Sequence, residues 1–269
     1  MQMVAASKMR KAQQLALAGR PYADLMNRVF APLVGTLGNF HHPLVHQRPI
    51  VKRCVILIST DKGLCGPLNS NILREALKYD PETTLFIAAG RKGAQFVARL
   101  KRKLVAEFSY KDTPLFDEAR AIAKFACNLY AKKEVDQVDI LYTNFISTLN
   151  QKPQVRSFLP VGEIRGVKAG IGTETAHPGS ILQGAAEFLY EPSQEKVLDA
   201  LIPHSLNFEI YQILLEAKAS EQSARMVAMK NATDNAKHLI KDLTLAYNKM
   251  RQANITKELL EITSATMTD

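Results

Sequence analysis

The sequence predicts an α/β protein in which a long antiparallel coiled coil of the N- and C-terminal helices carries an inserted, mostly parallel α/β domain. Both chain ends repeat small and apolar residues at alternating spacings of four and three. The middle alternates short β-branched runs with helical stretches, as doubly wound sheets do. Residues 205–262 contain neither proline nor glycine, which favours one long helix at the C-terminal end.

The N-terminal coiled-coil helix is expected over residues 1–40. Its seam comprises Ala5, Met9, Ala12, Ala16, Gly19, Ala23, Met26, Phe30, Leu33 and Leu37. A seam that recurs about every 3.5 residues lets two helices wind around each other left-handedly, and small residues allow their axes to approach closely. Because proline removes an amide donor, we expect a bend at Pro21 and a break near Pro32.

The C-terminal coiled-coil helix is expected over residues 205–264. The same rhythm recurs in Ala232, Ala236, Leu239, Leu243, Ala246, Met250 and Ala253. The matching period predicts that the two seams face each other. An ordinary amphipathic helix in a globular core is the alternative explanation of this spacing.

The inserted domain is expected over residues 50–190 and is Rossmann-like. Its predicted strands are Arg53–Ser59, Leu85–Ala89, Val105–Ser109 and Val138–Phe145, with Val155–Leu159 as an antiparallel edge strand. Helices are expected up to Tyr79, after Gly90 and over Leu115–Lys133. Residues 161–185 have the composition of a loop, which leads into a short strand at 188–190.

Composition excludes several classes of protein. With 46% hydrophobic and 23% charged residues, the 269-residue chain has the composition of a globular protein and is not a disordered tail. Apolar runs such as Val55–Ile58 are far shorter than the roughly 20 residues of a membrane-spanning helix. The first residues lack the apolar core of a signal peptide. Three cysteines without a C-x-x-C pair indicate a reducing compartment and no disulfide framework.

The strand-to-helix loop Ser59–Gly66 is the best candidate for chemistry. Phosphates often bind where a helix begins, yet the loop fits neither common glycine-rich phosphate motif, so a plain turn is the more probable interpretation. Cys65 lies near the helix start but has no histidine close in sequence to act as its base. A metal site of His41, His42 and His46 lacks further Cys, Asp or Glu ligands. We therefore expect no catalytic residue, no metal and no cofactor.

The basic charge sits at the two ends of the chain. The formal net charge is +9, and between Arg225 and Lys257 seven basic residues accompany two acidic ones. Such a balance suits an acidic partner, which could be nucleic acid, anionic lipid or an acidic protein surface. A basic coiled coil that binds nucleic acid is one hypothesis, although aromatic residues for base stacking are scarce in both ends.

Three segments resemble one family. Residues 3–13 (MVAASKMRKAQ) are similar to the N-terminal helix of the gamma subunit of F-type ATP synthases. Residues 220–236 (SEQSARMVAMKNATDNA), continued by 247–259 (YNKMRQANITKEL), resemble its C-terminal signature. Residues 61–69 (DKGLCGPLN) resemble its central loop. The resemblance extends over essentially the whole chain, except that family members usually carry a further segment before the residues that match Met1.

The resemblance implies a central-stalk rotor without catalysis or cofactor of its own. The coiled coil of such a rotor stands inside a hexamer of alpha and beta subunits. Its α/β domain and the lower part of its coil rest on the c-ring, together with an epsilon-type small subunit. Each complex contains one copy of the rotor. Motif matches imply that Arg225, Arg251, Gln252 and Thr256 contact beta subunits and that Glu191 contacts the c-ring. The implied location is peripheral, at the cytoplasmic face of a bacterial inner membrane.

Two other functions remain as alternatives on the sequence alone. A nucleic-acid-binding coil predicts salt-sensitive binding to DNA or RNA. A small-molecule enzyme that uses the Gly63–Gly66 loop predicts saturable nucleotide binding by the isolated chain.

Overall fold

The computed structural model describes residues 1–19, 21–23, 25–26, 29, 42–161, 191 and 193–266. The chain divides into two compact units, Met1–Val227 and Ala228–Asp269, and each is described by itself.

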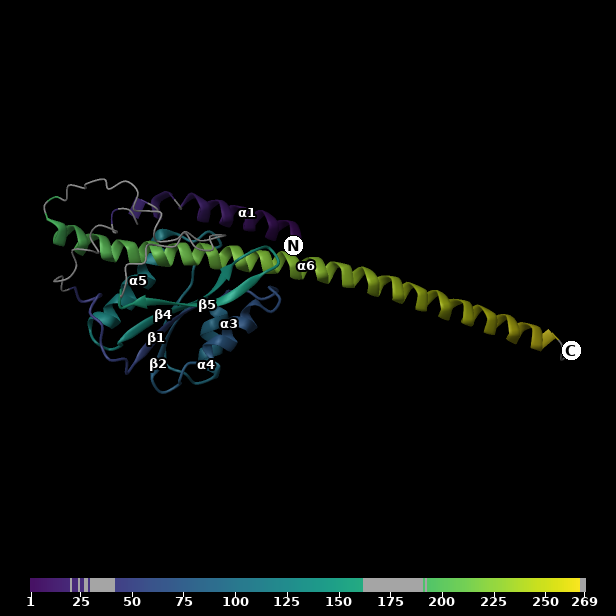
Figure 1. Cartoon of the computed structure of the whole chain (residues 1–269). Helices are drawn as coiled ribbons and strands as arrows, with labels where there is room; N and C mark the ends of the chain where they lie inside the picture. The colour runs from purple at the N-terminus through teal and green to yellow at the C-terminus, as the bar shows by residue number, and fades with distance from the viewer. Residues whose placement is uncertain are drawn as a thin grey trace. The chain divides into compact units, whose positions relative to one another are not determined.

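Unit 1 is built on a five-stranded sheet with the strand order β3-β2-β1-β4-β5. The strands are β1 (Arg53–Ile58), β2 (Thr84–Ala89), β3 (Leu104–Phe108), β4 (Gln137–Phe145) and β5 (Gln151–Leu159). The helices are α1 (Gln2–Ala18), α3 (Leu68–Ala76), α4 (Arg91–Arg99), α5 (Phe116–Ala131) and α6 (Gln194–Thr266). Strands β1 to β4 pair in parallel, and β5 pairs antiparallel with β4 (Figure 1).

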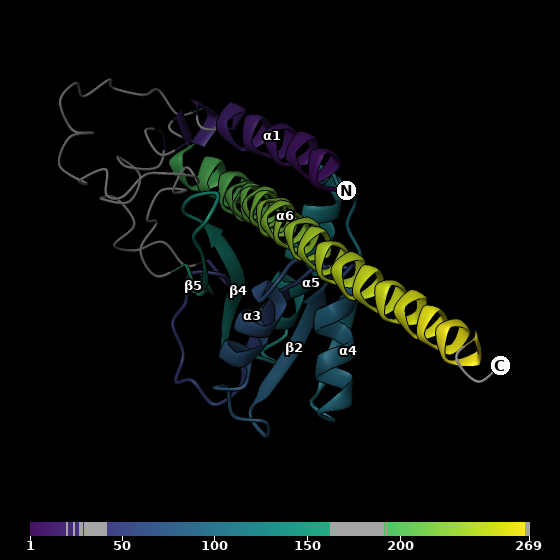
Figure 2. The same ribbon diagram turned by 90° about the vertical axis from the view of Figure 1, so that its right-hand side faces the viewer.

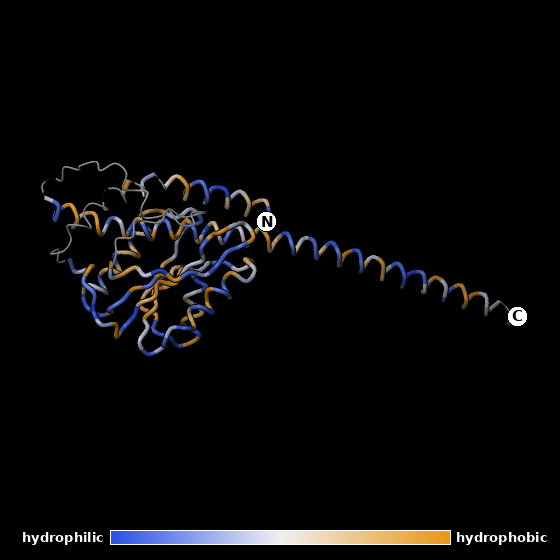
Figure 3. The backbone as a smooth tube through the Cα atoms, viewed as in Figure 1, coloured by the Kyte–Doolittle hydropathy of each residue, from blue (hydrophilic) through white to orange (hydrophobic). Residues whose placement is uncertain are grey.

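The sheet is apolar on both faces because helices cover both. Cys54, Ile56 and Ile58 of β1 belong to one core with α5 and the first part of α6. Val55 and Leu57 belong to a second core with α3 and α4. Hydrophobic residues accordingly concentrate in the strands (Figure 3). Such continuous apolar strands are typical of a parallel sheet with helices on either side.

The expected strands and helices of the α/β domain are confirmed with small shifts of their ends. Strand β5 begins at Gln151 rather than Val155, and it forms the antiparallel edge as expected. The expected loop 161–185 and the short strand 188–190 lie outside the described residues, apart from Val161.

Helix α6 begins at Gln194, earlier than the expected start near Ser205, and contains Pro203. A proline inside a helix costs about 3 kcal/mol because it removes one backbone hydrogen bond. Leu198, Ile202 and Leu206 recur every fourth residue around it and are almost completely buried. Packing of this apolar stripe on the core offsets the lost bond, so the helix continues through the proline.

The N-terminal seam is buried against the part of α6 that lies in unit 1. Ala5, Met9, Ala12 and Ala16 of α1 are buried. Ala12 clusters with Ala219, whereas the ring of Tyr22 packs on Phe208 at 4.6 Å between centroids. Later residues of the N-terminal segment thus meet earlier residues of α6, so the two helices run antiparallel, as Figure 2 also shows.

Gly19 lies beside Gln212 of α6. A Cβ atom at Gly19 would fall 1.9 Å from Nε2 of Gln212, so a larger residue there would require the Gln212 side chain to move. Helix α1 ends at Ala18, and residues 21–23 are helical; Arg20 lies outside the described residues, so the bend expected at Pro21 stays a prediction. Pro32 and the seam residues Phe30, Leu33 and Leu37 lie outside the described residues.

Within unit 1, the N-terminal seam packs on an earlier part of the C-terminal helix than the repeated seam suggested. The seam of α1 contacts residues of α6 such as Ala219. In unit 2, the side chains of the predicted C-terminal seam, Ala232 to Ala253, are exposed, including Leu239, Leu243 and Met250. A shared period indicates two helices with similar seams, but it does not specify which residues pair across them.

Gly90 is required where β2 joins α4. Its φ of +110° is one that residues with a side chain rarely adopt, and an added Cβ would lie 2.2 Å from the Ser59 carbonyl oxygen. We expect Gly90→Ala to lower the free energy of unfolding by about 2–3 kcal/mol, because it adds backbone strain and a clash with backbone. Urea unfolding of the full chain measures this change.

Gly63→Ala is the matched control for Gly90→Ala. A Cβ at Gly63 meets no atom within 4 Å, so this variant should unfold at nearly the wild-type urea concentration. Equal stability of the two variants would contradict the assigned backbone conformation at Gly90.

Candidate functional site

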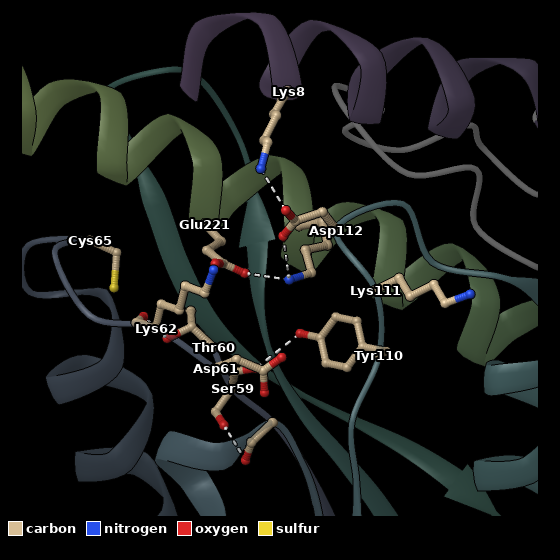
Figure 4. A network of polar contacts seen from close by, with 12 residues as sticks. Lys8, Ser59, Thr60, Asp61, Lys62, Cys65, Tyr110, Lys111, Asp112 and Glu221 are labelled. Carbon is tan, nitrogen blue, oxygen red and sulfur yellow. Dashed lines mark hydrogen bonds and ion pairs between the residues drawn. The ribbon is translucent and has the colours of Figure 1, made fainter. Parts of the chain in front are cut away.

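A network of charged and polar groups, buried at its centre and half exposed at Asp112 and Lys8, joins α6 to the loops at the carboxyl ends of the strands (Figure 4). At its centre is Lys218 of α6, whose side chain is 2% exposed. Its ammonium lies 3.0 Å from Oε2 of Glu221 and 3.7 Å from Oδ1 of Asp112. It also lies 4.6 Å from the centre of the Tyr110 ring, on which a cation is electrostatically favoured. These contacts offset the large cost of removing an ammonium group from water.

Asp112 connects α1 to this network. It follows β3 and lies 2.6 Å from Nζ of Lys8, on α1. The hydrogen bond from Lys8 holds the pKa of Asp112 below its usual value, and the positive charge of Lys218 adds to this effect while partial burial opposes it. One carboxylate therefore links two helices that are far apart in the sequence.

Arg225 extends the network to the loop between β1 and α3. Its guanidinium lies 2.8 Å from Oε1 of Glu221, which is itself almost completely buried. The same group donates to the carbonyl oxygens of Gly63 at 3.3 Å and Lys62 at 3.5 Å. Arg225 was predicted to contact a partner subunit. In the structure it binds its own chain, and contact with a partner stays a prediction.

The β1–α3 loop is held in shape by internal hydrogen bonds. Thr60 Oγ1 donates to the Lys62 carbonyl at 2.7 Å, and Asn69 Nδ2 donates to Thr60 Oγ1 at 2.8 Å and to Cys65 Sγ at 3.3 Å. The Tyr110 hydroxyl donates to the Ser59 carbonyl at 2.9 Å, and burial raises the pKa of Tyr110, so it stays protonated. The loop that Arg225 contacts is thus preformed.

The loop does not have the properties of a catalytic site. Cys65 is buried, and desolvation raises the pKa of its thiol, which disfavours the thiolate that a nucleophile needs. His42 and His46 belong to no group of metal-binding side chains in the described part of the chain, and His41 lies outside it.

The opposite side of α6 is bound to the β4–β5 hairpin. Ser220 Oγ donates to the Thr143 carbonyl at 3.1 Å, and Ser223 Oγ donates to the Thr148 carbonyl at 2.8 Å. A further ion pair joins Arg156 of β5 to Glu209 of α6 at 2.8 Å. Burial raises the pKa of Glu209, and the guanidinium of Arg156 opposes this shift.

The other predicted contact residues are solvent-exposed. Arg251, Gln252 and Thr256 lie in unit 2, where Thr256 Oγ1 donates to the Gln252 carbonyl at 2.9 Å, a bond within the helix. Glu191 is exposed. The roles of all four residues as partner contacts stay predictions.

The sequence analysis missed Lys218, Glu221 and Asp112. A usable signal was present, because Lys218 and Glu221 are spaced i, i+3 in a stretch whose other residues are mostly small or apolar. When the surrounding residues of the helix are buried, the charged groups of such a pair need further hydrogen-bonding or ionic partners, which must come from other elements.

Loss of the central carboxylate should destabilise unit 1. Glu221→Ala leaves both Lys218 and Arg225 without their shortest ion pair, so we expect the free energy of unfolding to fall by about 3 kcal/mol. Glu75→Ala is the control, because Glu75 forms an exposed i, i+3 pair with Lys78 that is worth at most about 0.5 kcal/mol. Urea unfolding of both variants measures the difference, and similar losses would contradict the assigned burial of the network.

Asp112 should contribute a pH-dependent part of the stability. Because its pKa is lowered on folding from the usual 3.8, its contribution is present above that pH and is lost as the pH falls below it. The difference in unfolding free energy between the wild type and Asp112→Asn should therefore shrink on acidification. Urea titrations over a series of acidic pH values measure it, and a difference that stays constant would contradict the assigned ion pairs.

Comparison with known proteins agrees with this architecture. The ATP synthase family model matches residues 1–267. The ATP synthase gamma chain of Methylacidiphilum infernorum (isolate V4) is 46% identical over 270 residues, which cover 98% of this chain and 90% of that protein. The gamma chain of Opitutus terrae is 45% identical with the same coverage.

Solved structures support the same assignment. A chain in the central stalk and c-ring structure of the Tetrahymena thermophila mitochondrial ATP synthase is 26% identical, with a TM-score of 0.64. That match covers 87% of this chain and 97% of the other. A chain of the Euglena gracilis mitochondrial ATP synthase shares the fold with a TM-score of 0.63 at 17% identity. On the evidence of the family model and of relatives that match along nearly its whole length, the chain belongs to the family of ATP synthase gamma chains.

Proposed function

We propose that this chain is the central-stalk rotor of an F-type ATP synthase. The match to ATP synthase gamma chains along 98% of the sequence carries the proposal, and the antiparallel packing of α1 on α6 agrees with it. In this role, rotation of the c-ring turns the subunit, and the rotor drives the conformational cycle of the catalytic beta subunits in ATP synthesis. The rotor itself carries no catalytic site.

Coupling of this kind requires contact energies that differ between rotor angles. A beta subunit changes conformation only if the rotor binds one of its states more tightly than another at a given angle. Unit 2 offers such a surface, since Leu239, Leu243 and Met250 are exposed on a helix that also bears several basic side chains. Exposed apolar clusters mark interaction sites.

The proposed partners are the alpha and beta subunits, an epsilon-type small subunit and the c-ring, with one rotor per complex. Arg251, Gln252 and Thr256 would make polar contacts with beta subunits, and Glu191 would contact the c-ring. Arg225 would contact a beta subunit from a side chain that Glu221 already orients. The complex would be peripheral to the cytoplasmic face of a bacterial inner membrane, and the described residues contain no helix able to span a membrane.

The basic ends of the chain suit acidic loops on the hexamer, so the charge needs no nucleic acid to explain it. The nucleic-acid hypothesis has no support from the comparisons, since the relatives are named ATP synthase gamma chains.

Reconstitution with purified alpha and beta subunits tests the rotor role. We expect a stable assembly on size exclusion that hydrolyses ATP. Arg251→Ala and Gln252→Ala should each lower the hydrolysis rate several-fold, corresponding to a loss of about 1 kcal/mol of contact energy.

Lys237→Ala is the matched control, because it removes one exposed basic side chain from the same unit. Failure of the wild-type chain to assemble would refute the rotor role. Assembly with unchanged hydrolysis in both contact variants would keep the rotor role and reject Arg251 and Gln252 as contact residues.

A further inference from the structure

The strand order reverses between β1 and β4. From β1 the chain adds β2 and then β3 on one side, and β4 pairs with the other side of β1. In open α/β sheets, ligands bind outside the carboxyl ends of the strands at this point of reversal. In this chain the carboxyl ends of β1 and β4 continue into the β1–α3 loop and the β4–β5 turn.

A helix of the same chain occupies this edge of the sheet. Ser220 and Ser223 of α6 donate hydrogen bonds to the carbonyls of Thr143 and Thr148, at the end of β4 and in the following turn. Arg225 donates to the carbonyls that follow β1. In other doubly wound proteins, the backbone at this edge faces a small-molecule ligand. In this chain, backbone carbonyls at the same edge accept hydrogen bonds from side chains of α6.

Lys218 fixes the angle of α6 about its own axis relative to the α/β domain. Its ammonium is enclosed by Glu221 from its own helix, by Asp112 after β3 and by the Tyr110 ring. The ammonium lies at the end of a long side chain, well away from the axis of α6. A rotation of α6 about its axis would therefore move the ammonium away from Asp112 and the Tyr110 ring. The buried charge would then lose partners that come from the α/β domain, which makes that turn costly.

We propose that the ligand-binding edge of this fold has become a socket for α6, in which Lys218 is the positioning residue that sets the angle of α6 on the α/β domain. The inference deepens the proposed rotor function and rests on it. Torque applied to the α/β domain passes to α6 through this socket. Lys8 of α1 also contacts Asp112, so the network reaches α1 through a half-exposed ion pair.

The test measures torsional stiffness in the assembled complex. The alpha and beta subunits are fixed to a surface, and a probe is attached to the α/β domain through Glu107→Cys, an exposed position on β3. We expect Lys218→Met to raise the variance of the probe angle during the pause before ATP binding by about twofold, because a buried contact between helix and domain is lost. Lys218→Arg, which keeps the charge, should restore most of the stiffness.

Lys78→Met is the matched control, because Lys78, just after α3, forms an i, i+3 pair with Glu75 like that of Lys218 with Glu221, but its side chain is exposed. It should leave the angular variance unchanged. If Lys218→Met does not assemble, Asp112→Asn provides the second variant, because it removes the ion pair with the domain while Lys218 keeps Glu221 and the Tyr110 ring. Asp112→Asn should raise the variance in the same direction.

A merely structural role predicts a different result, in which these variants melt at lower temperature but show wild-type angular variance when assembled. That result would overturn the socket while leaving the rotor intact. Absence of rotation in the wild-type assembly would instead count against the proposed function.

Discussion

The structure of unit 1 depends on the burial of polar groups around one stretch of α6. Gln212, Glu216, Lys218, Ser220, Glu221, Gln222 and Ser223 are all nearly inaccessible to solvent. Because a buried charge or amide is costly without a partner, the surrounding elements must supply partners at fixed positions. Three segments that are distant in the sequence do so, namely the β1–α3 loop, the residues after β3 and the β4–β5 hairpin. The polar groups of α6 therefore determine how the α/β domain is placed on the helix.

The side of α6 that faces α1 is held differently. Ala12 and Ala16 present little more than a methyl group each, so contact there depends on close approach of the backbones. Gln212 is the exception, since its amide is buried and makes no hydrogen bond with any described residue. Such a group costs roughly 1–3 kcal/mol. The sides of α6 that meet the α/β domain are thus specified by directional bonds, whereas the side that meets α1 is specified by small residues and carries the cost of the unpaired Gln212 amide.

The elements of the α/β domain were predictable from the sequence because each depends on local pattern. The run at Val55–Ile58 reads as a buried strand, and Gly90 marks a strand-to-helix junction. The start of α6 was not predictable from local rules, because long-range packing of Leu198 and Leu206 overrides Pro203. The pairing between the two helices was not predictable for a similar reason. A repeated seam indicates which residues of a helix share a face, but not which residues of the other helix they contact.

The candidate site was predictable only in part. The resemblance to a family predicted that Arg225 contacts a partner subunit, but no sequence pattern showed that it contacts the carbonyl of Gly63, far away in the chain. Asp112 and Lys218 meet only because β3 and α6 are brought together by the sheet, so their pairing is a property of the tertiary structure.

The packing of α1 on residues near Ala219 has a consequence for synthesis of the protein. The first helix leaves the ribosome before any of its partner residues have been made, and the whole α/β domain is translated in between. Non-local contacts of this kind form late, because a long loop must close first. During the wait, an apolar seam is a hazard for aggregation. The buried seam of α1 consists of alanines and a single methionine, so this face of the nascent helix exposes little apolar surface before α6 is made.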